Sequence, residues 1–288
     1  MGEQTARVNG VRICYETLGD PADRPLLLVM GLGGPLIWWD DQLCRMLVDR
    51  GFFVVRYDNR DSGRSEAMTG RASLVGSFLG ARQPYSLADM ADDAAGLLDH
   101  LGITAAHVTG VSMGGMIAQT LAIRHPKRVR SLVSVMSTTG RRLVGWPDPR
   151  VLRMLMAPGA RDRADYVELA LLSFRRIGSP GFPFDEPRMG VRSGDTWDRG
   201  LNRAGTLRQL AAITSSPDRT AGLRGLRVPA LVVHGRADPL VHVSGGRATA
   251  RAIPGAELVL VPGMGHDLPR EVWPLLVDGI DRTARRAG

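Results

Sequence analysis

Length, composition and charge limit the classes of protein to which this chain can belong. Its 288 residues suffice for one large domain or two small ones, and a hydrophobic content of 44 % is ordinary for a globular protein and argues against disorder. The net charge of +8 comes almost wholly from arginines that are spread among acidic residues, with Lys127 the only lysine, so we expect no nucleic-acid partner.

The start of the chain and its cysteines predict a cytoplasmic location. The segment MGEQTARVNG has no apolar signal-peptide core, and no apolar run approaches the roughly 18 residues of a membrane span. Cys14 and Cys44 have no CxxC spacing and are expected to be free thiols in a reducing compartment, with one bridge between them as the open alternative. The arginine excess leaves peripheral contact with lipid headgroups open, and the oligomeric state is not predicted.

Six short apolar segments predict strands that are buried on both faces of a sheet. Each is rich in aliphatic residues and is bounded by turn residues. They span residues 26–31, 52–58, 106–111, 131–136, 230–235 and 257–263. Before them, residues 7–19 contain an Asn9-Gly10 turn signal, which predicts an antiparallel hairpin at the edge of the sheet.

Helical patterns alternate with these strands. They span residues 40–51, 86–102, 113–125, 244–253 and 271–286. The second begins with a Ser86-x-x-Asp89 capping pattern and ends at Gly102. Alternation of this kind predicts right-handed crossovers, and therefore an α/β fold with a doubly wound, mostly parallel sheet.

The strand rhythm stops between residues 137 and 227. Because a structureless loop of that length is implausible in a compact domain, we expect a helical cap here, with one helix over 163–177. The core would then consist of residues 1–136 and 228–288. Residues 71–85 fit a further short lid segment and a surface loop equally well.

The segment VTGVSMGG, residues 108–115, places Ser112 between Gly110 and Gly114 where a buried strand meets a helix. Gly-x-Ser-x-Gly at such a junction is the pattern of a nucleophile elbow, in which a strained turn projects the serine hydroxyl above the sheet. The helix N-terminus adds free N–H donors for a developing oxyanion. We therefore predict that Ser112 is a nucleophile.

A nucleophilic serine needs a base and a carboxylate that orients the base. The order expected along the chain is serine, acid, histidine, each after a strand. Asp238 follows the strand at 230–235, and His266 follows the next strand; Asp267 is the less favoured acid because adjacent loop residues seldom face each other. The backbone N–H groups of Leu32 and Met113 are the predicted oxyanion donors.

These motifs resemble the α/β-hydrolase superfamily over nearly the whole chain. YDNRDSGRS (57–65), HGRADPL and PGMGHDLP resemble its strand-end turn, acid loop and histidine loop. LLLVMGLGG, DMADDAAGLLDHLG and GMGHDLPRE are similar to the actinobacterial carboxylesterases that include lipase-G-type esterases and aclacinomycin methylesterases. Many relatives have histidine where this chain has Met30, which puts the anchoring of that loop in doubt.

The resemblance implies a serine esterase that acts on a small-molecule carboxylic ester and needs neither a metal ion nor an organic cofactor. A thioesterase, a lipase, a carbon–carbon hydrolase, a perhydrolase or haloperoxidase, and a non-catalytic ligand-binding protein stay open as alternatives. Dehalogenases and epoxide hydrolases of this fold use an aspartate at the elbow, so the serine argues against both activities.

Apolar residues of the cap and of the loop after the first core strand are the candidates for substrate contacts. They fit a pocket for apolar or bulky esters, and those in the cap fit the packed core of the cap equally well. The candidates are Trp38, Trp39, Met154, Met156, Leu171, Leu172, Phe174, Phe182 and Phe184.

Overall fold

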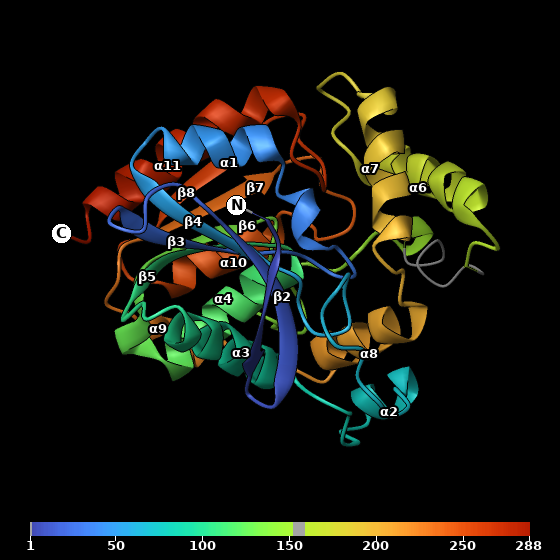
Figure 1. The fold of residues 1–288 in the computed structure, drawn as a ribbon, viewed down its shortest axis with the longest axis horizontal. Helices are drawn as coiled ribbons and strands as arrows, with labels where there is room; N and C mark the ends of the chain where they lie inside the picture. The colour runs from blue at the N-terminus through green and yellow to red at the C-terminus, as the bar shows by residue number, and fades with distance from the viewer. Residues whose placement is uncertain (1, 152–158) are drawn as a thin grey trace.

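A twisted sheet runs through the middle of the molecule (Figure 1). The computed structural model describes residues 2–151 and 159–288, and within them the sheet has eight strands in the order β1-β2-β4-β3-β5-β6-β7-β8. All neighbours from β4 to β8 run parallel, which confirms the predicted doubly wound sheet. The parallel strands are β3 (Arg24–Val29), β4 (Phe52–Tyr57), β5 (Ala106–Val111), β6 (Val129–Val135), β7 (Ala230–Gly235) and β8 (Glu257–Val261).

The remaining two strands form the predicted hairpin at one edge of the sheet. β1 (Gln4–Val8) and β2 (Val11–Leu18) pair antiparallel, with Val8 opposite Val11. Asn9 and Gly10 both have positive φ, 47° and 76°, as a two-residue hairpin turn of the primed type requires. β2 then pairs antiparallel with β4 and joins the hairpin to the parallel sheet.

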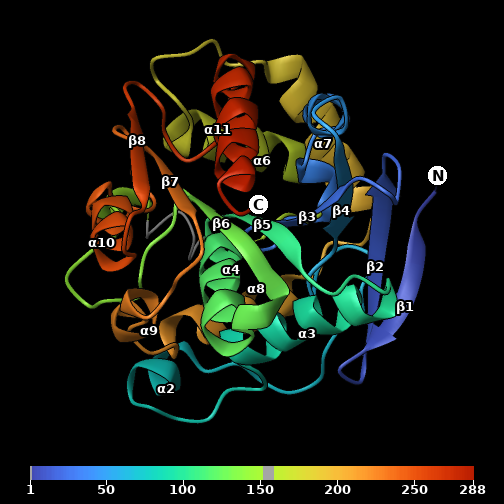
Figure 2. The same ribbon diagram turned by 90° about the vertical axis from the view of Figure 1, so that its left-hand side faces the viewer.

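Helices cover both faces of the sheet (Figure 2). α1 (Asp41–Val48) and α11 (Trp273–Arg285) lie on one face, and α3 (Leu87–His100), α4 (Met113–Arg124) and α10 (Ser244–Ala252) lie on the other. Three short 3₁₀ helices, η1 (Leu36–Trp38), η2 (Pro126–Arg128) and η3 (Arg270–Val272), complete the core. Within the described residues, no helix is long and apolar enough to cross a bilayer.

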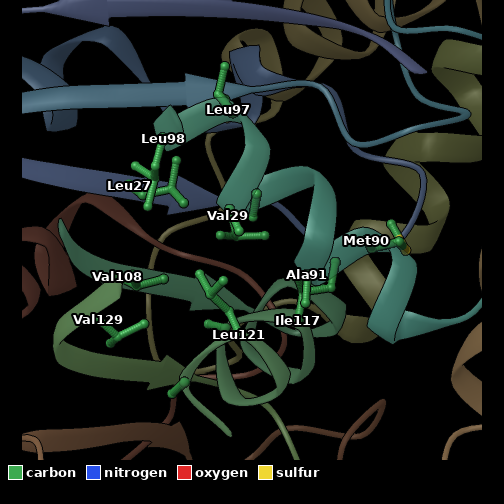
Figure 3. Packing of buried hydrophobic residues seen from close by; sticks show 14 of the residues in the cluster. Leu27, Val29, Met90, Ala91, Leu97, Leu98, Val108, Ile117, Leu121 and Val129 are labelled. Atoms are coloured by element: carbon green, nitrogen blue, oxygen red, sulfur yellow. The ribbon is translucent and has the colours of Figure 1, made fainter. Parts of the chain in front are cut away.

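β3 is buried on both faces of the sheet, which is why its sequence is a continuous apolar run. Leu26 and Leu28 pack into the cluster under α1 and α11, whereas Leu27 and Val29 pack into the cluster under α3 and α4 (Figure 3). All four side chains are fully buried, because each face of the strand is covered by helices.

The local signals of α3 are present as predicted. The Ser86 hydroxyl accepts the N–H of Asp89, and the Asp89 carboxylate accepts the N–H of Ser86, which together form a capping box. After the helix, Gly102 has a φ of 67°, a conformation that glycine adopts without strain.

The chain between β6 and β7, which we call the insertion, contains α6 (Arg163–Ile177), α7 (Glu186–Asp198), α8 (Arg203–Thr214) and α9 (Thr220–Arg224). α6 and α7 pack on each other and stand to one side of the sheet (Figure 1). Two buried ion pairs fasten the insertion to the turn after β4, Arg199 to Asp58 at 2.6 Å and Arg208 to Asp61 at 2.7 Å.

Residues 71–85 form a short helix, α2 (Leu74–Phe78), which packs against α8. Its apolar side chains are turned outward, with Phe78 59 % exposed and Leu79 81 % exposed. Elsewhere, Cys14 and Cys44 are buried and unbridged, and burial raises the pKa of each thiol to about 12. Both thiols are therefore protonated and poorly reactive at neutral pH.

His107 is a buried group whose titration is expected to weaken the fold in acid. It lies in β5, and its Nδ1 is 2.9 Å from Ser131 Oγ. Burial, with Arg130 and Arg24 nearby, lowers its pKa from 6.5 to about 4. Below pH 6.5 the unfolded chain therefore binds a proton that the folded chain does not, and stability falls with decreasing pH until about pH 4.

We predict that the free energy of unfolding drops by up to about 1.4 kcal/mol per pH unit in this window because of His107. Urea unfolding of wild type and His107→Gln at about pH 7 and about pH 5 measures the effect, and the variant should lose about 1–2 kcal/mol less on acidification. An equal acid loss in both proteins would show that other groups are responsible.

Candidate active site

Ser112 occupies the sharp turn between β5 and α4. Its φ of 54° and ψ of −120° are strained for a residue with a side chain, and its N–H donates to Val135 O at 2.9 Å. A Cβ on Gly110 would overlap the carbonyl oxygen of Gly114, and a Cβ on Gly114 would overlap that of Val29. Both glycines are therefore required for α4 to start so close to the sheet.

The structure brings Ser112, His266 and Asp238 into one hydrogen-bonded chain. His266 Nε2 lies 3.0 Å from Ser112 Oγ, and His266 Nδ1 lies 2.7 Å from Asp238 Oδ2. His266 and Asp238 are 8 % and 4 % exposed, so bulk water competes little for these contacts. Such a chain can remove a proton from the serine hydroxyl and stabilise the resulting imidazolium.

Asp238 is held from its other side by the backbone. Its Oδ1 accepts the N–H groups of Leu240 at 2.9 Å and Val241 at 2.8 Å, which leaves Oδ2 facing His266. His234 lies behind it and donates from Nε2 to Val241 O at 2.8 Å; burial lowers the pKa of His234 and keeps it neutral. Asp267, the alternative acid, instead accepts the hydroxyl of Ser179.

The loop after β3 lies against the elbow. A Cβ on Gly31 would be 3.2 Å from Ser112 Cβ, a tight contact, so the glycine lets the loop backbone approach the serine closely. Within the described chain, the N–H groups of Leu32 and Met113 donate to no protein acceptor. Two such N–H groups on either side of a serine can bind the oxygen of an attacked carbonyl.

Side-chain amides anchor this loop, although Met30 replaces the expected histidine. Asn59 Nδ2 donates to Met30 O at 2.9 Å, and Gln209 Oε1 accepts the N–H of Gly33 at 2.8 Å. Asn59 belongs to the YDNRDSGRS motif, so its position after β4 was a usable signal. Gln209 comes from α8 in the insertion, and no local pattern links it to a loop 176 residues away.

A family model described as the alpha/beta hydrolase fold matches residues 24–269. The chain belongs to the α/β-hydrolase family. It is 32 % identical to rhodomycin D methylesterase of Streptomyces peucetius over 301 residues, which cover 96 % of each chain. It is 28 % identical to 3-oxoadipate enol-lactonase 2 of Acinetobacter baylyi, over 85 % of this chain and 83 % of that one.

Among solved structures, the enol-lactonase from Burkholderia xenovorans LB400 superposes with a TM-score of 0.75 at 26 % identity. The match covers 98 % of this chain and all of the other. Together with the methylesterase relatives, these matches identify the protein as a carboxylic ester hydrolase of the α/β-hydrolase type.

A cavity of about 1430 Å³ in this α/β-hydrolase contains Ser112 and His266 in its wall. The loop after β3, the loop after β8 and helices α6, α7 and α8 line it, and it is open to solvent on one side. Of the predicted substrate contacts, Trp38, Phe174 and Phe184 line the cavity. Trp38 and Phe174 stack with ring centroids 4.9 Å apart, which places a pair of stacked aromatic rings in the cavity wall.

Other predicted contacts lie elsewhere in the α/β-hydrolase. Trp39 follows Trp38 directly, but its side chain is fully buried and belongs to the core under α1 and α11. Phe182 also packs against that cluster. Among the described residues, neither Trp39 nor Phe182 is part of the cavity wall.

The leucines predicted on α6 do not line the cavity either: Leu172 is 57 % exposed, and Leu171 is absent from the wall. Met154 and Met156 lie outside the described residues.

The cavity also contains a charged cluster on α7. Arg188 and Arg192, one helical turn apart, both donate to Asp40, and these contacts outweigh burial and hold the pKa of Asp40 below its ordinary value. The two guanidinium groups also lie over aromatic rings, Arg188 4.7 Å from the centroid of Trp273 and Arg192 5.7 Å from that of Trp38. The cluster ties α7 to the start of α1.

Proposed function

We propose that this α/β-hydrolase cleaves carboxylic esters through an acyl-enzyme on Ser112. The observation that carries the proposal is the hydrogen-bonded chain from Ser112 through His266 to Asp238, with contacts of 3.0 and 2.7 Å, in the wall of a large cavity. A serine hydroxyl is a weak nucleophile near neutral pH, and an oriented histidine activates it by accepting its proton.

In the proposed reaction, His266 Nε2 takes the proton of Ser112 while Oγ bonds to the ester carbonyl carbon. The carbonyl oxygen becomes an oxyanion that the N–H groups of Leu32 and Met113 bind. The bond to the alcohol oxygen then breaks, and the alcohol leaves with the proton from His266. Water, deprotonated by the same histidine, attacks the acyl carbon, which releases the carboxylic acid and restores Ser112.

The cavity favours an ester with a bulky acid part. Its volume of about 1430 Å³ exceeds the roughly 300–1,000 Å³ of common small-molecule sites, and Trp38 and Phe174 form an aromatic wall. Two relatives, each 32 % identical to this chain, are named as methylesterases of rhodomycin D. We infer that the substrates are methyl esters, or esters of another small alcohol, with a ring-containing acid.

Residues 137–227 are proposed to act as a cap over a core of residues 1–136 and 228–288. Tyr166 and Phe174 of α6, with Arg188 and Trp197 of α7, line the cavity opposite the core loops. The buried ion pairs of the turn after β4 hold α8 and the end of α7 against the core. Thr206 and Leu207 of α8 also line the cavity, so three helices of the cap face the substrate.

A series of methyl esters with acids of increasing size tests this proposal. For methyl acetate, methyl benzoate and methyl 2-naphthoate, followed by proton release, kcat/KM should rise by about tenfold or more per step. Phe174→Ala should reduce the differences in kcat/KM among the three esters, because the stacking of Phe174 on Trp38 is lost. Fastest turnover of methyl acetate would contradict the bulky acyl pocket, and a wild type without turnover of any ester would refute the esterase.

A further inference from the structure

The end of α6 is joined to the loop that carries His266 by direct main-chain contacts. Ile177 O accepts the N–H of His266 at 2.7 Å, and the N–H of Gly181 donates to Gly263 O at 2.9 Å. The two segments are so close that a Cβ on Gly181 would lie 2.6 Å from Gly263 Cα. The insertion therefore touches the backbone of the residue that we propose as the catalytic base.

One side chain of the insertion strengthens this contact. Ser179 Oγ accepts the N–H of Gly265 at 2.9 Å and donates its own hydrogen to Asp267 Oδ1. Gly265 and Asp267 are the residues on either side of His266, so a single hydroxyl group holds both flanks of the base. Burial raises the pKa of Asp267, and hydrogen bonds from the hydroxyl and the backbone of Ser179 oppose this rise by stabilising the carboxylate.

The core holds the same loop from the opposite side. The N–H of Ala237, next to Asp238, donates to Met264 O at 2.9 Å. The His266 loop is thus fixed between the acid loop of the core and the end of α6 in the insertion.

We propose that Ser179 is a positioning residue for His266, an inference that rests on the proposed function. His266 must keep one ring nitrogen 3.0 Å from Ser112 and the other 2.7 Å from Asp238 at the same time. A displacement of about 1 Å at such a site can cost about 100-fold in rate. The insertion therefore acts on the chemistry as well as covering the substrate.

Three serine variants test the proposal. Ser179→Ala removes both hydrogen bonds, and Ser179→Thr keeps the hydroxyl. Ser216→Ala removes a hydroxyl whose one hydrogen bond within the described residues is to Ala212 O at the end of α8. For S179A we expect kcat on a p-nitrophenyl ester to fall by about 10- to 100-fold with KM changed less than about threefold. S179T should recover most of the lost rate, and S216A should match wild type.

Titration of active serines with a fluorophosphonate separates a misplaced base from a misfolded protein. The proposal predicts full titration of S179A with a low kcat per active site. Wild-type kcat in S179A, or a loss explained entirely by fewer titratable sites, would overturn it. If S179A is insoluble, Ser179→Cys replaces it, because a thiol is only a weak hydrogen-bond donor. The kcat per active site and the fraction of titratable serines are then measured on that variant and interpreted in the same way. A wild type without ester turnover would instead refute the proposed function.

Discussion

Replacing Ser112 with alanine is expected to lower kcat for ester hydrolysis by roughly 10⁴- to 10⁶-fold. No other group in the described cavity wall combines a hydroxyl with a bonded histidine base as Ser112 does with His266. The substitution should leave the fold intact, because within the described residues the Ser112 hydroxyl forms a hydrogen bond only with His266.

Turnover of a p-nitrophenyl ester and the thermal unfolding midpoint, measured on the same preparation, check both parts of this prediction. Ser216→Ala, remote from the cavity, is the matched control and should retain wild-type turnover. Substantial ester hydrolysis by a folded S112A protein would contradict the assignment of the nucleophile.

Asp238→Asn is the second substitution with a large expected effect. The N–H groups of Leu240 and Val241 bind Oδ1, so the amide oxygen must take that position and the NH₂ group must face His266 Nδ1. Nδ1 of His266 then has to accept a hydrogen bond, which puts the imidazole proton on Nε2. A protonated Nε2 cannot take the proton from the Ser112 hydroxyl. We expect kcat to fall by about 10⁴-fold, as for wrong-tautomer variants of such triads.

Asp267→Asn is the matched control for this experiment. Its oxygen can still accept the hydroxyl of Ser179, and it does not contact His266 Nδ1. We expect kcat to fall by less than about tenfold. An Asp267 variant as damaged as the Asp238 variant would mean that the acid has been assigned to the wrong carboxylate.

Much of the fold could be predicted because its signals are local. The parallel strands are continuous apolar runs, as expected for a sheet that is covered by helices on both faces. The Asn9-Gly10 turn and the Ser86-Asp89 capping box each depend on residues only a few positions apart. The elbow is local as well, because Gly110, Ser112 and Gly114 fit one strand-to-helix junction. Such features follow from backbone geometry and need no knowledge of distant segments.

The details of the cavity depend on contacts between distant segments and could not be predicted in the same way. Trp38 and Trp39 are chemically identical neighbours, and only the packing of η1 decides that one lines the cavity and the other joins the core. Gln209 and Ser179 act on loops far away in the sequence. Their roles become visible only when the insertion is placed against the core.

The central claim is that Ser112 forms a covalent intermediate with the substrate. The most direct test is to react the protein with a fluorophosphonate and to locate the adduct by peptide mass spectrometry, alongside ester turnover. We predict one adduct per chain, on the peptide that contains Ser112, with loss of turnover in proportion to labelling. Full labelling at another residue, or ester turnover that survives complete labelling of Ser112, would contradict the account.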